Sequence, residues 1–326
     1  MNKKISLILL LLLLFYFLVQ SCCLFENQIN YKELMRDFVI KLSQYAKDFN
    51  QNFIIIPQNG GEILTLDGDI NSNLATDYIS AIDAVGREDL LYGYLNDDEE
   101  TPEEDRLYMI SFLNIAKNAG KTVLVIDYCS TISKMNDSYL KNNQLGFISF
   151  AADSRNLDNI PSYPANPYNE NANNIESLND VKNFLYIINP SNYNNKNDFL
   201  NALKDTNYDL IIIDLFFNEE ILTNEDINSL KTKKNGGKRL IICYMSIGEA
   251  ENYRYYWQQD WYLNPPSFLA SENPNWPGNY KVKYWDPKWQ AIIYGNDESY
   301  LKKILNANFD GVYLDIIDAF EYFENQ

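Results

Sequence analysis

Eight short apolar runs, separated by segments with helical periodicity, constrain the fold of this chain more than any other feature. Most of the runs are continuous rather than alternating, as strands are when helices cover both faces of a sheet. Eight such strands with helices between them predict a single α/β domain, a (β/α)8 TIM barrel, and a doubly wound open sheet is the alternative. The predicted strands are Phe53–Pro57, Ile79–Val85, Thr122–Asp127, Gly146–Ala151, Phe184–Ile188, Leu210–Leu215, Leu240–Met245 and Val312–Ile316.

The predicted helices carry start and stop signals. Thr101-Pro102-Glu103-Glu104 has the pattern of a capping box with proline at the first helical position, and Gly120 marks the end of that helix. Thr223 and Asp226 predict a second helix start of the same kind. Apolar residues at helical spacing over 31–49 predict a helix before the first strand.

The order of these elements is unusual for a barrel, because a helix comes first and a strand comes near the end. If the eighth strand lies beside the first, the helix at 31–49 takes the place of the helix that normally follows strand eight. We therefore expect a circularly permuted barrel over 31–326, in which the Asn- and Pro-rich segment 156–183 joins the two halves.

The segment 1–22 has the pattern of a signal peptide. Lys3 and Lys4 precede an uncharged apolar run, Ile5–Val19, which is short for a membrane span. Residues 19–22 resemble a lipobox, in which Cys22 would be lipidated and 23–30 would form a tether. This predicts an extracytoplasmic, membrane-anchored lipoprotein at the cell surface or in the periplasm, and an uncleaved N-terminal anchor is the alternative.

Composition excludes several classes of chemistry. The chain has no histidine, so triads that depend on histidine and imidazole metal sites are ruled out. After the leader only Cys129 and Cys243 remain, which is too few for a disulfide framework, and no metal site or cofactor loop is recognisable. With 27 Lys and Arg against 45 Asp and Glu, the net charge of −18 argues against nucleic acid as a partner. We expect that the protein needs no cofactor and that it is a monomer.

Aromatic residues concentrate in one segment, 247–297, which contains all five tryptophans of the chain. Such a long connection between two strands usually has a function, and aromatic rings beside carboxylates are typical of sugar-binding clefts. A small aromatic core beneath a loop is the alternative. We interpret 247–297 as a rim insertion that serves both purposes, with one or two rings in contact with ligand.

Acidic and amide residues dominate the carboxyl ends of the predicted strands, where the active site of a (β/α)8 barrel lies. Two carboxylates that flank a bond are the usual device for glycoside hydrolysis. Asp315 is the strongest candidate because it stands within an apolar run, and its alternative role is a structural ion pair with Arg254. The strand-end residues are Gln58, Asn59, Glu62, Glu88, Asp127, Tyr128, Asp153, Asn189, Asp214, Tyr244, Ser246, Glu249, Asp315 and Asp318.

Several segments together resemble glycoside hydrolase family 114, the endo-α-1,4-polygalactosaminidase-like barrel family. The most specific are Leu240–Arg254, Trp276–Trp289 and Phe309–Ala319, and similarity extends to Phe53–Gly60, Ala81–Glu88 and Val123–Tyr128. The segments that resemble the first half of the family follow the others here, which agrees with a permutation. The resemblance implies a hydrolase that cleaves internal α-linkages of an amino-sugar-rich, galactosaminan-like polysaccharide.

The resemblance also implies roles for individual residues. Asp315 and Glu88 correspond to the proposed catalytic pair, and which of them is the acid stays open, as does a retaining or inverting outcome. A non-catalytic surface lipoprotein that binds a glycan or a protein partner in the same groove is the rival interpretation. The implied substrate-binding residues are Asp214, Tyr244, Glu249, Arg254, Tyr284, Trp285, Asp318, Asn59, Asp127 and Tyr128.

Overall fold

The computed structural model describes residues 29–326. The predicted signal segment 1–22, its Cys22 and most of the tether 23–30 lie outside these residues. Within the described part, no helix combines the length and the apolar character that crossing a membrane requires.

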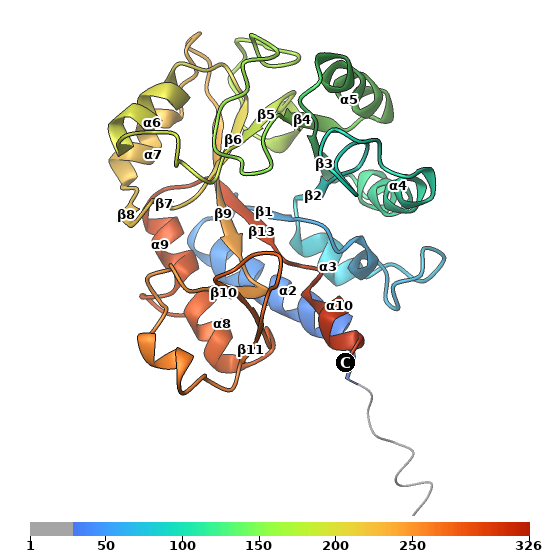
Figure 1. Cartoon of the computed structure of the whole chain (residues 1–326), viewed down its shortest axis with the longest axis vertical. Helices are drawn as coiled ribbons and strands as arrows, with labels where there is room; N and C mark the ends of the chain where they lie inside the picture. The colour runs from blue at the N-terminus through green and yellow to red at the C-terminus, as the bar shows by residue number, and fades with distance from the viewer. Residues whose placement is uncertain (1–28) are drawn as a thin grey trace, which may run out of the picture. The chain divides into compact units, whose positions relative to one another are not determined.

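Residues 32–326 form one compact unit in which helices alternate with parallel strands (Figure 1). The helices are α2 (Tyr31–Phe49), α3 (Thr76–Ala81), α4 (Glu103–Asn118), α5 (Ile132–Leu145), α6 (Lys196–Lys204), α7 (Asn224–Leu230), α8 (Pro287–Ile293), α9 (Tyr300–Asn306) and α10 (Ala319–Glu324). The parallel strands are β1 (Ile54–Pro57), β2 (Ala84–Glu88), β3 (Thr122–Tyr128), β4 (Ile148–Ala152), β5 (Phe184–Tyr186), β6 (Leu210–Ile213), β9 (Leu240–Ser246) and β13 (Gly311–Asp315). Nearly every residue of these strands is buried, as expected for continuous apolar runs covered by helices.

The parallel strands follow one another in cyclic order. One sheet has the order β5-β6-β9-β13-β1, and a second has the order β2-β3-β4. A single parallel bridge from Gln58 to Gly86 connects β1 to β2. Going round, the strands therefore keep their chain order, without the reversal that a doubly wound sheet would show.

The predicted closed barrel is corrected in one respect, because no hydrogen-bonded ladder joins β4 to β5 in the described residues. The two strands contact through Phe150 and Phe184, whose ring centroids are 5.9 Å apart. Beyond the strand ends, the carbonyl oxygen of Leu157 accepts hydrogen bonds from the backbone N–H groups of Ile188 (3.1 Å) and Asn189 (3.2 Å). The joining segment, not a ladder, thus connects the two sheets here.

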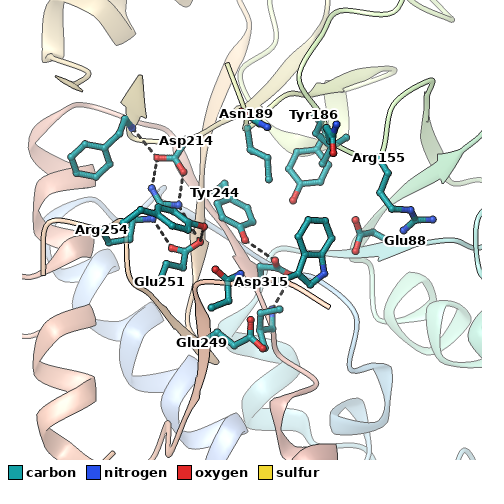
Figure 2. A pocket seen from close by; sticks show the side chains of 18 of the residues that line it. Glu88, Arg155, Tyr186, Asn189, Asp214, Tyr244, Glu249, Glu251, Arg254 and Asp315 are labelled. Carbon is teal, nitrogen blue, oxygen red and sulfur yellow. Dashed lines mark hydrogen bonds and ion pairs between the residues drawn. The ribbon is translucent and has the colours of Figure 1, made fainter. Parts of the chain in front are cut away.

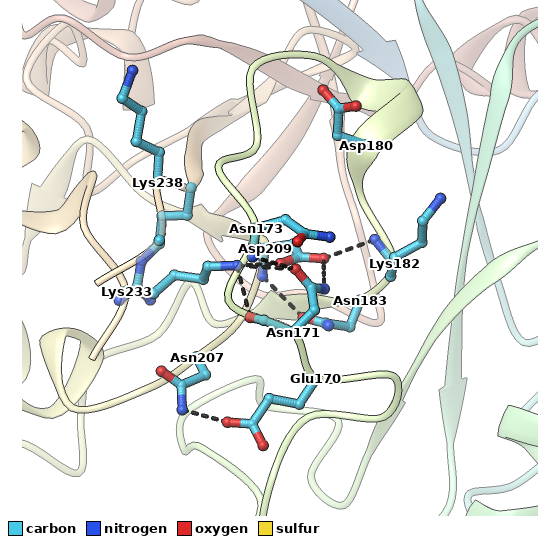
Figure 3. A network of polar contacts seen from close by, with 12 residues as sticks. Glu170, Asn171, Asn173, Asp180, Lys182, Asn183, Asn207, Asp209, Lys233 and Lys238 are labelled. Carbon is cyan, nitrogen blue, oxygen red and sulfur yellow. Dashed lines mark hydrogen bonds and ion pairs between the residues drawn. The ribbon is translucent and has the colours of Figure 1, made fainter. Parts of the chain in front are cut away.

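The joining segment is also anchored near the amino ends of the strands, by a buried ion pair (Figure 3). Lys233 and Asp209 are both fully buried, with Nζ 2.8 Å from Oδ1. Lys233 also donates to the carbonyl oxygen of Asn171 (2.9 Å), and Asp209 accepts from the Asn171 side chain (2.9 Å) and the backbone of Lys182 (2.9 Å). These contacts satisfy both buried charges with groups of the joining segment.

A separate, antiparallel sheet lies within the segment 247–297. It comprises β10 (Glu249–Glu251), β12 (Asn279–Val282) and β11 (Leu269–Glu272), in that order. Gly248 immediately precedes β10, and a Cβ there would lie 2.2 Å from the carbonyl oxygen of Ile316. Glycine is therefore required for this sheet to approach the end of β13. The remaining short elements are η1 (Gly61–Leu64), η2 (Leu178–Asp180), η3 (Gln259–Tyr262), β7 (Phe216–Phe217) and β8 (Glu220–Ile221).

Candidate active site

A cavity of about 530 Å³ opens at the carboxyl ends of the parallel strands, and both parallel sheets contribute to its wall (Figure 2). Its charged lining is mostly acidic. Among the described residues, it includes the carboxylates of Glu88, Asp214, Glu249, Glu251, Asp315 and Asp318 and the guanidinium groups of Arg155 and Arg254. The polar and aromatic residues of the wall include Asn59, Tyr128, Asn156, Tyr186, Asn189, Tyr244, Tyr253, Trp276 and Asn279.

Glu88 and Asp315 lie together in this cavity and share one hydrogen-bond donor. Nε2 of Gln58 donates to Glu88 Oε2 at 2.7 Å and to Asp315 Oδ1 at 2.9 Å. Because both oxygens bind the same nitrogen, the distance between them cannot exceed the sum of these two hydrogen-bond lengths. The strand order explains the proximity, since β13 and β2 flank β1 although their residues are far apart in sequence.

Each carboxylate also has a tyrosine partner. Tyr244 donates its hydroxyl to Asp315 Oδ2 at 2.7 Å, and the hydroxyl of Tyr128 donates to Glu88 Oε1. Burial and the adjacent carboxylate raise the pKa of each phenol well above its ordinary value, so both phenols remain donors. All four carboxylate oxygens of the pair are therefore held in place by protein donors.

The backbone turns into the left-handed region immediately after each of the three linked residues. Asn59, Asp89 and Ile316 follow Gln58, Glu88 and Asp315, with φ of 61°, 58° and 60°. The value is most unfavourable for Ile316, which is β-branched. The Ile316 N–H donates to Asp315 Oδ1, 2.8 Å away. Such strain concentrates at functional sites, where the surrounding structure maintains it.

The two carboxylates have perturbed proton affinities. Burial, and next the charge of Glu88, raise the pKa of Asp315 to about 8. Burial also raises the pKa of Glu88, although the hydrogen bond from Tyr128 opposes this. Two carboxylates this close do not readily ionise together, so the pair retains one proton well above the usual titration range of Asp and Glu.

Arg254 forms a buried ion network at the other side of the cavity (Figure 2). Its two terminal nitrogens bind Asp214 Oδ1 at 2.8 Å and Oδ2 at 2.6 Å, and Nε binds Glu251 Oε2 at 2.5 Å. The alternative role of Asp315 as the ion-pair partner of Arg254 is therefore wrong. Asp214 and Glu251 fill that role.

Arg155, immediately before the joining segment, lies over the ring of Tyr128 with 3.9 Å between its guanidinium carbon and the ring centroid. It binds Asp89 Oδ1 at 2.9 Å and Asp97 Oδ1 at 2.6 Å. A charged side chain of the loop after β4 thus packs against the tyrosine that donates to Glu88.

Most of the residues predicted to bind substrate reach the cavity, but three do not. Tyr284 is fully buried and packs on Trp285, and Trp285 packs on Phe323 (ring centroids 4.8 Å apart), so the two belong to the aromatic core of the rim. Asp127 is fully buried too. It accepts from the Leu91 N–H (2.7 Å) and the Ser138 hydroxyl (2.6 Å), which fixes the turn after β2 and helix α5. The predicted roles of Tyr284, Trp285 and Asp127 in contacting substrate are corrected accordingly.

Several residues of the site have no corresponding prediction as binding residues. Gln58, which is 2% exposed and supports the carboxylate pair from outside the cavity wall, is the most important. Its only sequence signal is its position directly after a predicted strand. Glu251 and Tyr253 lie within the motif Leu240–Arg254, so that motif could have identified them. Trp276 begins the motif Trp276–Trp289 within the aromatic segment, whereas Arg155 has no local signal of its own.

No cluster of potential metal ligands occurs among residues 29–326. The two cysteines of this part of the chain, Cys129 and Cys243, are unpaired and buried. The polar groups of the cavity are therefore carboxylates, amides, phenols and guanidinium groups.

A model of the glycoside-hydrolase family GH114 matches residues 164–326, half of the chain. An uncharacterized protein of Methanocaldococcus jannaschii is 41% identical over 185 residues, which are 54% of this chain and 49% of that protein. An uncharacterized protein of Deinococcus radiodurans is 39% identical over 127 residues, 39% of each chain. One of Thermotoga maritima is 47% identical over 85 residues, 26% of this chain and 25% of that protein. The chain spans about half the length, or less, of these curated relatives.

Proposed function

The chain belongs to glycoside-hydrolase family GH114, and we propose that it cleaves internal α-linkages of an amino-sugar-rich polysaccharide by a retaining, two-carboxylate mechanism. The family implies a TIM-barrel-like α/β fold and hydrolysis of a glycosidic bond. The observation that carries the mechanism is the shared donor, Gln58, which holds Glu88 and Asp315 side by side in the cavity.

The separation of the two carboxylates supports retention of configuration. Retaining enzymes hold their carboxyl groups about 5–5.5 Å apart, and inverting enzymes hold them about 6.5–9.5 Å apart to admit a water. Glu88 Oε2 and Asp315 Oδ1 lie 2.7 Å and 2.9 Å from one nitrogen, and these two lengths together fall short of the inverting range.

Retention requires two steps. In the first, the ionised carboxylate bonds to the anomeric carbon while the protonated one gives its proton to the glycosidic oxygen, and the bond between that carbon and oxygen breaks. In the second, the carboxylate that lost its proton takes one from a water, whose oxygen bonds to the anomeric carbon as the glycosyl ester breaks. The pair that retains one proton between Glu88 and Asp315 supplies both forms at the start.

The charge of the cavity supports an amino-sugar substrate. Six carboxylates and two guanidinium groups line it within the described residues, and the whole chain carries −18. Such a field attracts cationic chains and opposes polyuronates and sulfated glycans. Neutral units are compatible with it as well.

The test is to incubate the protein with partly deacetylated α-1,4-galactosaminan and to count new reducing ends, with Asp315→Asn as the control. Activity that the substitution abolishes is the expected result, and proton NMR of the first products should then show α-anomers. No activity in either protein would favour the rival function, in which the same groove binds a glycan without cleaving it.

Azide distinguishes the roles of the two carboxylates. With an activated aryl glycoside, azide should restore turnover to both Glu88→Ala and Asp315→Ala. The variant that lacks the nucleophile then gives a glycosyl azide of inverted configuration, and the variant that lacks the acid gives one of retained configuration.

We also propose that the barrel is circularly permuted. The cyclic strand order and the ladder between β1 and β13 support this. So do the hydrogen bonds that the Leu157 carbonyl accepts from the residues after β5, and a family match that covers half of the chain. A reordered chain, with 164–326 followed by 31–163, should fold and keep the activity. A reordered chain that is insoluble or inactive would count against the permutation.

Membrane attachment through a lipid on Cys22 completes the proposal. Labelled palmitate should enter the unmodified protein and Cys23→Ser but not Cys22→Ser, and only the labelled proteins should partition into detergent. Equal labelling of all three proteins would exclude Cys22 as the site.

A further inference from the structure

Trp276 differs from the other tryptophans of the rim. Trp257, Trp261, Trp285 and Trp289 each pack on neighbouring rings, with centroids 4.8–5.7 Å apart. Trp276 has no such ring contact among the described residues, is 52% exposed, and lines the cavity. An exposed indole at the mouth of a polar cavity is available to stack on a ligand.

The turn that carries Trp276, between β11 and β12, is held in one conformation. The Trp276 N–H donates to the carbonyl oxygen of Asn273 (3.2 Å), and the Gly278 N–H donates to Glu272 Oε1 (2.7 Å). Gly278 has φ of 93°, and a Cβ there would lie 2.8 Å from the Asn252 side chain. The indole therefore lies on an ordered turn, and a ligand that stacks on it would cost little additional ordering.

Glu249 is joined to this turn and has a free oxygen. Asn273 Nδ2 donates to Glu249 Oε1 at 2.9 Å, and Lys281 Nζ lies 3.1 Å from the same oxygen. The other oxygen, Oε2, is buried and has no hydrogen-bond partner in the described part of the chain, although Glu249 is only 1% exposed and lines the cavity. A buried acceptor without a donor is costly, and a ligand donor would remove that cost.

We propose that Trp276 and Glu249 form a binding subsite for one pyranose unit, separate from the pair that cleaves the bond. The C–H face of the sugar would stack on the Trp276 indole, and an ammonium or hydroxyl group of the same unit would donate to Glu249 Oε2. The subsite rests on the proposed function, since it assumes a glycan in the cavity. Its consequence is a preference for chains long enough to occupy it as well as the cleavage point.

The proposal is tested by binding in a Glu88→Gln background, which prevents hydrolysis during calorimetry. The probes are α-1,4-linked galactosamine oligomers, the dimer and the hexamer. Trp276→Ala should weaken hexamer binding about tenfold, whereas Trp276→Phe, which keeps a ring, should weaken it less than about threefold. Leu263→Ala, an exposed apolar side chain of the same rim outside the cavity wall, is the matched control and should bind as its parent does.

Glu249→Gln tests the polar half of the subsite. An N-acetylated hexamer is compared with the free amine, and a preference for the amine that Glu249→Gln abolishes identifies an ammonium donor. Weaker binding of both hexamers identifies a hydroxyl donor. Unchanged binding of both would overturn the role of Glu249.

The outcomes separate the subsite from the proposed function. If the unmodified protein cleaves galactosaminan but Trp276→Ala binds the hexamer as tightly as its parent, the subsite is wrong and the function stands. If the unmodified protein releases no reducing ends and the Glu88→Gln protein binds no oligomer, both are wrong.

Discussion

Glu88 and Asp315 are far apart in the sequence but adjacent in the cavity, because one amide nitrogen lies 2.7 Å from the first and 2.9 Å from the second. The glutamine that supplies it, Gln58, follows β1, the strand between β2 and β13. A primary amide has two N–H groups at a fixed angle, so it sets both the distance and the orientation of its two acceptors. The carboxylate pair is therefore positioned by a third strand, in addition to the two that carry it.

Gln58→Met removes this donor while keeping the length of the side chain. The reactive oxygens then lose their common support, and we expect kcat to fall about 10²-fold with little change in KM. Steady-state kinetics on galactosaminan measure this. Gln290→Met, which removes a glutamine bond to the Tyr284 carbonyl oxygen outside the cavity, should leave kcat unchanged. Equal loss in both variants would show that the effect is structural.

The pH dependence of kcat/KM should be bell-shaped, with both limbs displaced to higher pH than ordinary carboxyl groups give. Activity needs one proton on the pair. On the alkaline side, activity should be lost as the Asp315–Glu88 pair loses that proton. This should occur near pH 8, because burial and the charge of Glu88 raise the pKa of Asp315 to about 8. On the acid side, activity should be lost when the second carboxylate is protonated. This limb should also lie at higher pH than for an ordinary carboxyl group, because burial raises the pKa of Glu88. A profile with a single acid limb near pH 4 would contradict a shared proton.

The free energy of unfolding should fall as pH rises, because the folded chain holds the proton of Asp315 more tightly than the unfolded chain does. The pKa of Asp315 is higher in the folded chain than in the unfolded one, where Asp titrates near about 3.9. The folded state then binds more protons between about pH 4 and pH 8, so stability is full below this window and falls as pH rises through it. Asp315→Asn removes the buried charge and should stabilise the protein by about 0.5–2 kcal/mol at pH 8. Urea unfolding at pH 5 and pH 8 measures the difference, which should shrink at pH 5.

Much of the fold was predictable because each central strand is a continuous apolar run. The exception is instructive. The sequence predicts a strand over Ile79–Val85, whereas α3 ends at Ala81 and β2 begins at Ala84. Tyr78 and Ile79 are buried on the helix and Val85 in the strand, so one apolar run serves two elements and periodicity does not divide it.

Capping shows the same limit on a smaller scale. The box at Thr223 and Asp226 forms as predicted, with reciprocal side-chain bonds. At the other predicted box, the Thr101 hydroxyl donates to the Asp89 carbonyl oxygen instead, 2.8 Å away, and the helix begins after Pro102 without a side-chain cap. A tertiary contact competes with the local one and prevails, which a local pattern does not reveal.

The candidate site was predictable where residue type and strand position coincide, as they do for Asp315 and Glu88. It was not predictable where function depends on which way a ring faces. Tyr284 and Trp276 occur in one motif, yet Tyr284 is fully buried and Trp276 is half exposed at the cavity. Both are amphipathic aromatics with the same preferences, so their sequence context does not separate a core ring from a cleft ring.

Arg155 should influence the protonation of Glu88 through Tyr128 and through its own charge. Burial raises the pKa of Glu88, and the positive charge of Arg155 opposes this rise. The charge of Asp89 adds to the rise, and Arg155 also forms an ion pair with Asp89. Arg155→Met should therefore shift the acid limb of the kcat/KM profile to higher pH, and Arg155→Lys should shift it less, since the charge remains. Asp97→Asn removes only a half-exposed partner of Arg155 and should leave the limb in place. An identical acid limb in Arg155→Met would show that the arginine acts on packing alone.

The buried ion pair that anchors the joining segment can be compared with a neighbouring ion pair that is exposed to solvent. Lys233 and Asp209 are fully buried, whereas Lys234 and Asp205 form a pair at 2.8 Å with side chains 56% and 70% exposed. Lys233→Met leaves the Asp209 charge buried without its ammonium partner and should cost about 3–5 kcal/mol, because desolvation of that charge is no longer offset. Lys234→Met should cost at most about 1 kcal/mol, since water screens the exposed pair. Urea unfolding measures both, and limited proteolysis should cut 156–183 faster in Lys233→Met only. Equal costs for the two lysines would mean that the joining segment is held by its other contacts. The double variant Asp209→Leu and Lys233→Met removes the unpaired charge as well. If it is more stable than Lys233→Met alone, the unpaired charge is the cause of the loss.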